Sequence, residues 1–108
     1  MTSFSTEEEV RAAMAGGGVF LDVRRGEEIQ ERSLPAKYPC VHVECTRTDV
    51  SQLVRRAQEV FPDKDAPVIA FCRSGARSQC AKEALEKLGY RRVLNAGGLS
   101  NGDLDYLM

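Results

Sequence analysis

The residues best suited to chemistry are Cys72 and the polar loop after it, within the stretch VIAFCRSGARS at positions 68–78. An apolar run ends at the cysteine, a loop with two arginines and a glycine follows, and a helix-like segment begins at Gln79. A helix N-terminus and nearby cations lower the pKa of a cysteine, which ordinarily titrates near pH ~8.5. The sequence therefore predicts a nucleophilic thiolate at Cys72.

The same loop is suited to holding an anion. The N–H groups of residues 73–78 can curl into an anion-binding nest, in which Gly75 supplies a backbone conformation that other residues resist. Arg73 and Arg77 add full positive charges, and the dipole of the following helix adds a partial charge. We expect the thiolate to lie in a pocket that attracts anionic substrates.

Two reactions suit a thiolate in such a loop. It could attack the outer sulfur of thiosulfate, expel sulfite, keep the sulfur as a persulfide and pass it to a nucleophile. It could instead attack phosphorus in a phosphate ester, but the phosphatase loop places an arginine where this chain has Ser78, and Arg77 comes one residue early. A general acid for the leaving group is also not evident in the sequence. The spacing favours sulfur transfer.

Alternating strands and helices would position this loop at one edge of a sheet. Strands are expected at residues 3–5, 19–23, 40–44, 68–71 and 92–95, and helices after Thr6, at 26–31, from Thr48 or Asp49 to Phe61, at 79–88 and at 99–108. This order favours an α/β domain with a mostly parallel sheet and helices on both faces. Ligands of such sheets bind beyond the C-terminal strand ends, where Cys72 would lie. Asp22, inside an apolar strand, needs a partner, for which Arg24 and backbone N–H groups are candidates.

Three other polar residues are given structural interpretations. Cys40 and His42 would share one face of a strand, as a nucleophile and a base might in an enzyme, but a lone strand histidine is more often a structural hydrogen bonder. Cys80 is expected to pack within its helix. The alternative for Cys80 is a resolving role, in which it forms a disulfide with an oxidised Cys72.

Composition excludes several classes of protein. The 108 residues are expected to form one domain, 1–108, with ordinary globular proportions of hydrophobic (43%) and charged (29%) residues. A net charge of −1 gives no argument for nucleic acid or a membrane as partner, and no apolar run approaches the roughly 18 residues that span a bilayer. The four cysteines and one histidine match no zinc pattern, so neither metal nor cofactor is expected. Since the N-terminus lacks signal-peptide features, we expect a cytoplasmic monomer with reduced thiols.

The chain resembles the single-domain rhodanese-like sulfurtransferases over most of its length. The similarity is carried by the CRSGARS loop at 72–78, by LDVR at 21–24 with EEI at 27–29, and by the glycine pair at 97–98. The resemblance implies a rhodanese-like three-layer sandwich around a mostly parallel sheet of about five strands. It also implies transfer of a sulfane sulfur from a small anionic donor, thiosulfate or a persulfide, to a thiol, protein thiol or cyanide acceptor.

The resemblance further implies a role for each site residue. Cys72 would be the catalytic persulfide carrier, Asp22 and Arg24 would support the site structurally, and six loop residues would bind the substrate: Arg73, Ser74, Gly75, Ala76, Arg77 and Ser78.

The chain departs from the family pattern in two places. The segment RSLPAK at 32–37 keeps only the proline of the family's Gly-His-x-Pro-Gly-Ala segment, and Gly102 stands where many members have a tryptophan. These departures motivate the alternative of a non-catalytic rhodanese-fold module that binds a protein partner. A phosphatase or arsenate reductase is disfavoured because Ser78, and not an arginine, stands at the position where the phosphatase loop has its arginine.

Overall fold

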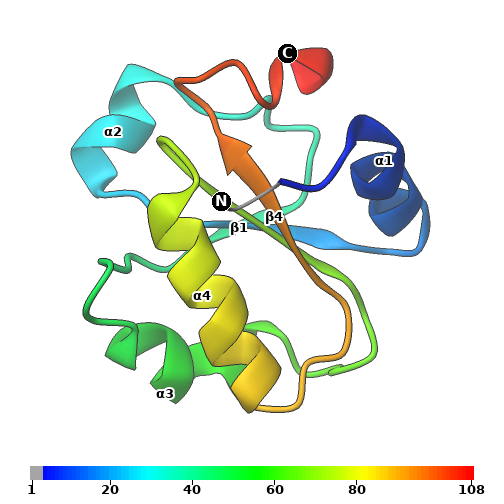
Figure 1. The fold of residues 1–108 in the computed structure, drawn as a ribbon, viewed down its shortest axis with the longest axis vertical. Helices are drawn as coiled ribbons and strands as arrows, with labels where there is room; N and C mark the ends of the chain where they lie inside the picture. The colour runs from blue at the N-terminus through cyan, green and yellow to red at the C-terminus, as the bar shows by residue number, and fades with distance from the viewer. Residues whose placement is uncertain (1–3) are drawn as a thin grey trace.

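A four-stranded parallel sheet with the order β2-β1-β3-β4 forms the centre of residues 4–108, the part of the chain that the computed structural model describes (Figure 1). The strands are β1 (Val19–Asp22), β2 (Cys40–His42), β3 (Val68–Cys72) and β4 (Val93–Gly98). Each pairing is parallel, so the C-terminal ends of the strands lie at the same edge of the sheet. The predicted α/β class with a mostly parallel sheet is confirmed.

Helices cover both faces of this sheet, as the sequence predicts. They are α1 (Glu7–Ala15), α2 (Gly26–Glu31), α3 (Ser51–Val60), α4 (Ala76–Lys87) and a 3-10 turn η1 (Asp105–Leu107). Residues of α3 and α4 share one core cluster with Leu21, Ala70 and Cys72. Residues of α1 and of the C-terminal segment share the other cluster with Phe20 and Ile69. The side chains of successive strand residues therefore pack against helices on opposite faces of the sheet, as the two-residue period of a strand requires.

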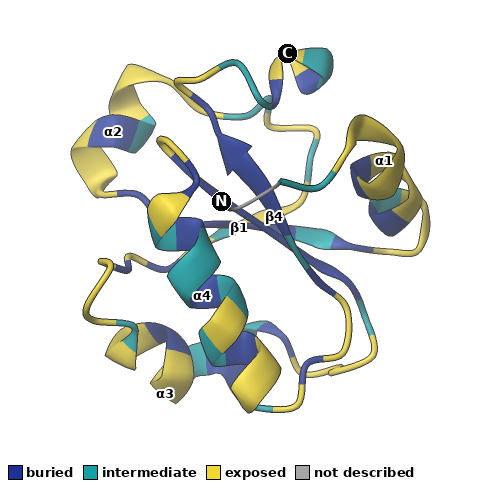
Figure 2. Ribbon diagram, viewed as in Figure 1, coloured by how far each residue is buried: buried dark blue, intermediate teal, exposed yellow. Residues whose placement is uncertain are grey.

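The strand that leads to Cys72 is the most deeply placed element. All five residues of β3 are buried, and Figure 2 shows the central strands in dark blue beneath helices with exposed outer faces. A continuous apolar run such as VIAFC is typical of a strand that is covered on both faces. No helix among residues 4–108 is long and apolar enough to cross a membrane.

The expectation of about five strands is wrong by one. The strand expected at residues 3–5 is absent from the described residues, and Ser3 itself lies outside them. Ser5 donates one backbone hydrogen bond to the carbonyl of Asn95 (N···O 2.9 Å), and α1 begins two residues later. A single bond does not make a ladder, so the sheet has four strands.

Several expected boundaries also differ from the structure, among them the start of α4, which lies at Ala76 rather than Gln79. The strand β2 ends at His42 rather than at residue 44. The strand β4 continues to Gly98 rather than ending at residue 95, because a register shift between the pairs Ala70–Asn95 and Cys72–Gly98 lets β4 keep pairing with β3. The helix expected over 99–108 is a series of turns followed by η1, with Gly102 in the left-handed region at φ +83°. A non-helical glycine in that segment interrupts a regular helix.

Candidate active site

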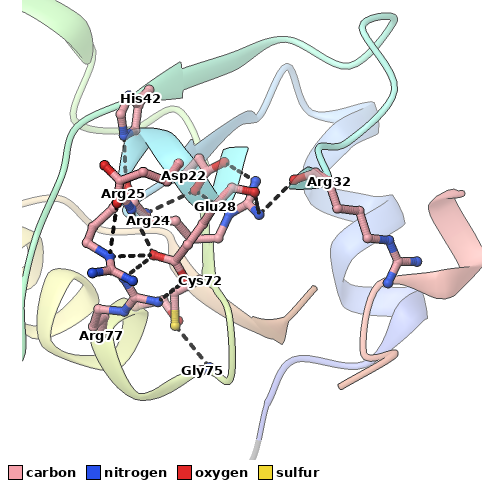
Figure 3. Close-up of polar contacts among 11 residues, drawn as sticks. Asp22, Arg24, Arg25, Glu28, Arg32, His42, Cys72, Gly75 and Arg77 are labelled. Carbon is pink, nitrogen blue, oxygen red and sulfur yellow. Dashed lines mark hydrogen bonds and ion pairs between the residues drawn. The ribbon is translucent and has the colours of Figure 1, made fainter. Parts of the chain in front are cut away.

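Cys72 lies at the C-terminal end of β3, directly before the loop that leads into α4. Its sulfur accepts a hydrogen bond from the backbone N–H of Gly75 (3.0 Å; Figure 3). It accepts a second one from the hydroxyl of Ser78 (3.4 Å). Burial of the thiol raises its pKa, but hydrogen bonds from the Ser78 hydroxyl and from the amides of Ser78, Ser74 and Gly75 outweigh burial. The pKa of Cys72 is therefore below its ordinary value, which favours the thiolate.

The loop reaches this arrangement because of Gly75. This residue is the N-cap of α4 and has φ +99°, a left-handed conformation that glycine adopts without strain. The conformation turns the amide of Gly75 toward the sulfur and starts α4 with its N-terminus beside Cys72. The positive end of the helix thus lies next to the thiol, as the sequence predicts.

A buried asparagine, Asn95 of β4, holds the first turn of α4 in place. Its side-chain oxygen accepts a hydrogen bond from the hydroxyl of Ser78 (2.7 Å), and its side-chain nitrogen donates to the carbonyl of Gly75 (3.0 Å). The residue is only 2% exposed, so these bonds are shielded from water. From the sequence, Asn95 was expected only as a strand residue, with no role at the site.

The glycine pair at 97–98 allows the loop to pass close to β4. A Cβ atom on Gly98 would overlap the carbonyl oxygen of Arg73 and would lie 2.5 Å from the Cα of Ser74. The segment after the pair then fixes the loop: the backbone N–H of Leu99 donates to the carbonyl of Cys72 (2.9 Å). Hence only a glycine at position 98 lets the Cys72 loop pack this closely against β4.

Asp22 and Arg24 form a buried ion pair at the end of β1. The guanidinium donates from Nε and from a terminal nitrogen to the two carboxylate oxygens, at 2.9 and 2.7 Å. Arg24 also donates to the backbone carbonyls of Glu28 and Arg32, so it connects β1 to the middle and the C-terminal end of α2. Arg24 is therefore the partner that Asp22 was expected to need.

His42 has the structural contact expected of it. Its Nε2 atom lies 2.6 Å from the backbone carbonyl of Arg24, which requires Nε2 to carry a proton and donate (Figure 3). A donor nitrogen cannot act as a base, so this atom does not activate Cys40. The contact instead joins the end of β2 to the turn after β1.

The two loop arginines have different environments. Arg73 is exposed, whereas Arg77 is half-buried and donates from two nitrogens to the two carboxylate oxygens of Glu28, each at 2.8 Å. Glu28 is buried, and the hydrogen bond from Arg77 lowers the pKa of this carboxyl to about 2. From the sequence, Glu28 was expected only within the short helix at 26–31 and the family-like EEI stretch at 27–29. No sequence pattern indicated its contact with Arg77, which joins residues 49 positions apart.

The remaining cysteines lie in different surroundings from Cys72. The Cys80 thiol donates to the backbone carbonyl of Arg47 (3.4 Å), in the connection that precedes α3. Burial raises the pKa of the Cys45 thiol to about 11, the opposite of the shift at Cys72. Cys40 is exposed on the edge strand β2. Among residues 4–108, no group of three or more His, Cys, Asp or Glu side chains is placed to hold a metal ion.

The altered segment at 32–37 lines a cavity rather than the Cys72 loop. The cavity has a volume of about 400 Å³ and is bordered by Leu34, Pro35 and Tyr38 together with Asp22 and His42. Cys72 is not among its lining residues. The departure from the family pattern therefore changes the surface beside the ends of β1 and β2.

Comparisons with known proteins point to one family. Residues 6–102 match the Rhodanese-like domain family. The chain is 35% identical over 69 residues to the thiosulfate sulfurtransferase PspE of Escherichia coli, a match that covers 63% of this chain and 66% of that protein. This chain therefore spans just under two thirds of the length of that curated relative.

Solved structures share the fold. A rhodanese with anions from E. coli is similar with a TM-score of 0.66 and 30% identity, over 78% of this chain and 89% of that chain. The human single-domain sulfurtransferase TSTD1 has a TM-score of 0.63 over 93% of this chain and 95% of that one. Its identity of 21% supports the fold alone.

Proposed function

The chain belongs to the rhodanese-like domain family, and from that membership we propose that it is a sulfurtransferase acting through a persulfide on Cys72. The observation that carries the proposal is the hydrogen bonding of the Cys72 sulfur by the Gly75 amide and the Ser78 hydroxyl. Such bonds favour the thiolate, which is the nucleophilic form of cysteine. Residues 1–108 are proposed to act as one domain.

The reaction has two displacements at sulfur. The Cys72 thiolate attacks the outer sulfur of the donor, a new S–S bond forms, and the donor's S–S bond breaks. For thiosulfate, sulfite leaves with the electron pair. An acceptor thiolate or cyanide then attacks the outer sulfur of the persulfide, and the Cys72 thiolate leaves. Neither displacement needs an external oxidant or reductant.

The loop has a separate task in each step. The amides of residues 73–78 and the start of α4 would hold the negative charge of the donor and then that of the persulfide. Within this stretch, Arg73, Ser74, Gly75, Ala76, Arg77 and Ser78 form the proposed substrate-binding set. The buried pair of Asp22 and Arg24 would keep the end of β1 beside the loop.

The donor and the acceptor are proposed by chemical class. The name of the curated E. coli relative includes thiosulfate, so thiosulfate or a persulfide is the proposed donor, and a small-molecule or protein thiol the proposed acceptor. A cytoplasmic monomer remains a prediction from the sequence.

The proposal is tested by rapid mixing of the protein with thiosulfate in the absence of an acceptor. We expect a burst of sulfite equal to the amount of protein, followed by steady turnover when cyanide is added as an assay acceptor. The Cys72→Ser variant should release no sulfite above background. A wild-type protein without a burst would favour the non-catalytic module instead.

A further inference from the structure

The positive charge of Arg77 is already paired within the protein. Its side chain is 19% exposed, and its two terminal nitrogens each lie 2.8 Å from a carboxylate oxygen of Glu28. This two-point geometry is the strongest arrangement between a guanidinium and a carboxylate. Arg73 is exposed, and its side chain forms no ion pair or hydrogen bond within residues 4–108. The two arginines of the loop are therefore not equivalent for an incoming anion.

Glu28 is fixed where it meets Arg77. It is the third residue of α2, and its carboxylate also accepts hydrogen bonds from the backbone N–H of Arg25 (3.0 Å) and, more weakly, from the exposed guanidinium of Arg25 (3.4 Å). The glutamate side chain is 9% exposed, and the hydrogen bond from Arg77 lowers its pKa to about 2. Glu28 is thus a permanent negative charge at neutral pH, close to the site that would receive the sulfur donor.

We propose that Glu28 determines donor charge preference: by pairing with Arg77 it removes one of the two full positive charges beside Cys72. Glu28 thereby shifts the preference of the site away from the thiosulfate dianion and toward sulfur donors with one negative charge, such as persulfide or thiosulfonate anions. This inference rests on the proposed function, since it concerns the donor of the same reaction. Glu28 is a positioning residue, because it acts through Arg77 and not on the reacting atoms.

The direction follows from Coulomb's law. The interaction energy between a donor and a fixed charge is proportional to the donor's own charge. A negative charge at Glu28 therefore opposes a dianion about twice as strongly as a monoanion in free energy. Both donors undergo the same displacement: sulfite leaves from thiosulfate, and a sulfinate leaves from a thiosulfonate. Comparing the two isolates the effect of charge.

The test measures KM and kcat for thiosulfate and for methanethiosulfonate with the Glu28→Gln variant. A tenfold fall in KM for thiosulfate corresponds to ~1.4 kcal/mol of binding free energy. The monoanion gains about half of that free energy, which corresponds to about a threefold fall in its KM. We expect changes of about this size, with kcat changed less than KM. The matched control is Glu27→Gln, which removes the same charge from the same helix at a side chain that is 77% exposed. It should change either KM by less than about twofold, because solvent and salt screen that charge.

A second variant keeps the inference testable if Glu28→Gln is unstable. The double variant Glu28→Gln/Arg77→Gln replaces the ion pair by two neutral side chains. If the pair is close to neutral for the donor, the ratio of the two KM values should stay within about twofold of wild type. The single Arg77→Gln variant, which leaves Glu28 unpaired, should instead disfavour thiosulfate. A double variant that loses thiosulfate as strongly as Arg77→Gln would overturn the proposal.

Failure of the proposed function gives a different result. If the wild type uses neither donor, the two KM values cannot be compared, and sulfate protection of Cys72 from iodoacetamide then tests Glu28. Protection should need about tenfold less sulfate in Glu28→Gln than in wild type. The same sulfate requirement in both proteins, or equal changes in the two KM values, contradicts the role assigned to Glu28.

Discussion

Ser78 shares one hydroxyl proton between two acceptors at the proposed site. The hydroxyl lies 2.7 Å from the side-chain oxygen of Asn95 and 3.4 Å from the sulfur of Cys72. A hydroxyl has a single O–H to donate, so the two bonds compete. A charged sulfur attracts the proton more strongly than a neutral thiol does. Formation of the thiolate should therefore turn the hydroxyl toward Cys72.

Removing this hydroxyl should make Cys72 less acidic. The Ser78→Ala variant loses a hydrogen-bond donor to the thiolate, so the pKa of Cys72 should rise. Alkylation of Cys72 by iodoacetamide, followed by mass spectrometry of its peptide, should then be slower at neutral pH by up to about tenfold. The alkylation rate should return to that of the wild type at higher pH, where Cys72 is ionised in both proteins. Ser51→Ala, at the start of α3, is the matched control and should not change the pH dependence of Cys72 alkylation.

An unchanged alkylation profile in Ser78→Ala would mean that the backbone amides alone set the acidity of Cys72. In that case the Ser78 hydroxyl serves only to hold Asn95.

Single residues were predictable from sequence where their partners lie nearby in the chain. Asp22 and Arg24 are two positions apart, and their pairing follows from the need of a buried carboxylate for a partner. Glu28 meets Arg77 across 49 positions, and Asn95 meets Ser78 across 17. These contacts depend on how α2 and β4 pack against α4, which residue patterns do not specify.

The unit formed by β3, its loop and α4 depends on the neighbouring strand β4. Gly98 pairs with Cys72 after a register shift, and a Cβ atom at Gly98 would meet the backbone of Arg73 and Ser74. Backbone atoms cannot move aside as a flexible side chain can. The loop geometry is therefore set by β4 as well as by its own sequence.

An alanine at position 98 should displace the Cys72 loop. We expect Gly98→Ala to lower the free energy of unfolding by about 1–3 kcal/mol, in line with other overpacked sites. The rate of sulfur loading from thiosulfate should fall by at least about tenfold. A misplaced loop needs to raise the activation free energy by only ~1.4 kcal/mol to have that effect. Gly26→Ala is the control, because nothing lies within 4 Å of a Cβ atom there. Retention of wild-type loading by Gly98→Ala would contradict the close approach of the loop to β4.

Elements with a clear apolar pattern were predicted well, and those fixed by pairing were not. The run at 68–71 and the amphipathic segment of α3 correspond to a strand and a helix in the structure. The end of β4 was missed because its last residues, AGG, carry no strand preference and are ordered by pairing with β3. The C-terminal segment lacks a helix because Gly102 takes a left-handed conformation.

At the scale of the whole molecule, the buried pair of Asp22 and Arg24 connects the sheet to its surroundings. Arg24 is hydrogen-bonded to Asp22 of β1 and to carbonyls in the middle and at the C-terminal end of α2, and its guanidinium lies 5.6 Å from the ring centre of Phe71 in β3. Both side chains are at most 5% exposed. Loss of one partner leaves an uncompensated charge in the interior.

Removing the carboxylate should therefore cost much of the stability of the fold. Asp22→Ala should lower the free energy of unfolding in urea at neutral pH by about 3–5 kcal/mol, against a typical total of about 5–15 kcal/mol. The control is Asp65→Ala, which breaks an exposed ion pair with Arg91 and should cost less than about 1 kcal/mol. Equal, small losses in the two variants would show that Arg24 finds other compensation.

The whole fold was predictable to the level of its class. Apolar strands alternating with helices, together with the resemblance carried by the CRSGARS loop, indicated the parallel sheet with helices on both faces. The count of strands was wrong, because within the described residues Ser5 makes one backbone hydrogen bond to Asn95 in place of a strand ladder. Long-range pairing decides such cases.

The central claim is that Cys72 takes up a sulfur atom, and intact-mass spectrometry tests it most directly. The protein is incubated with excess thiosulfate, freed of small molecules and weighed before and after treatment with a reducing thiol. The account predicts a gain of one sulfur atom that the thiol removes, and no gain in Cys72→Ser. An unchanged mass in the wild type, or the same gain in Cys72→Ser, would contradict it.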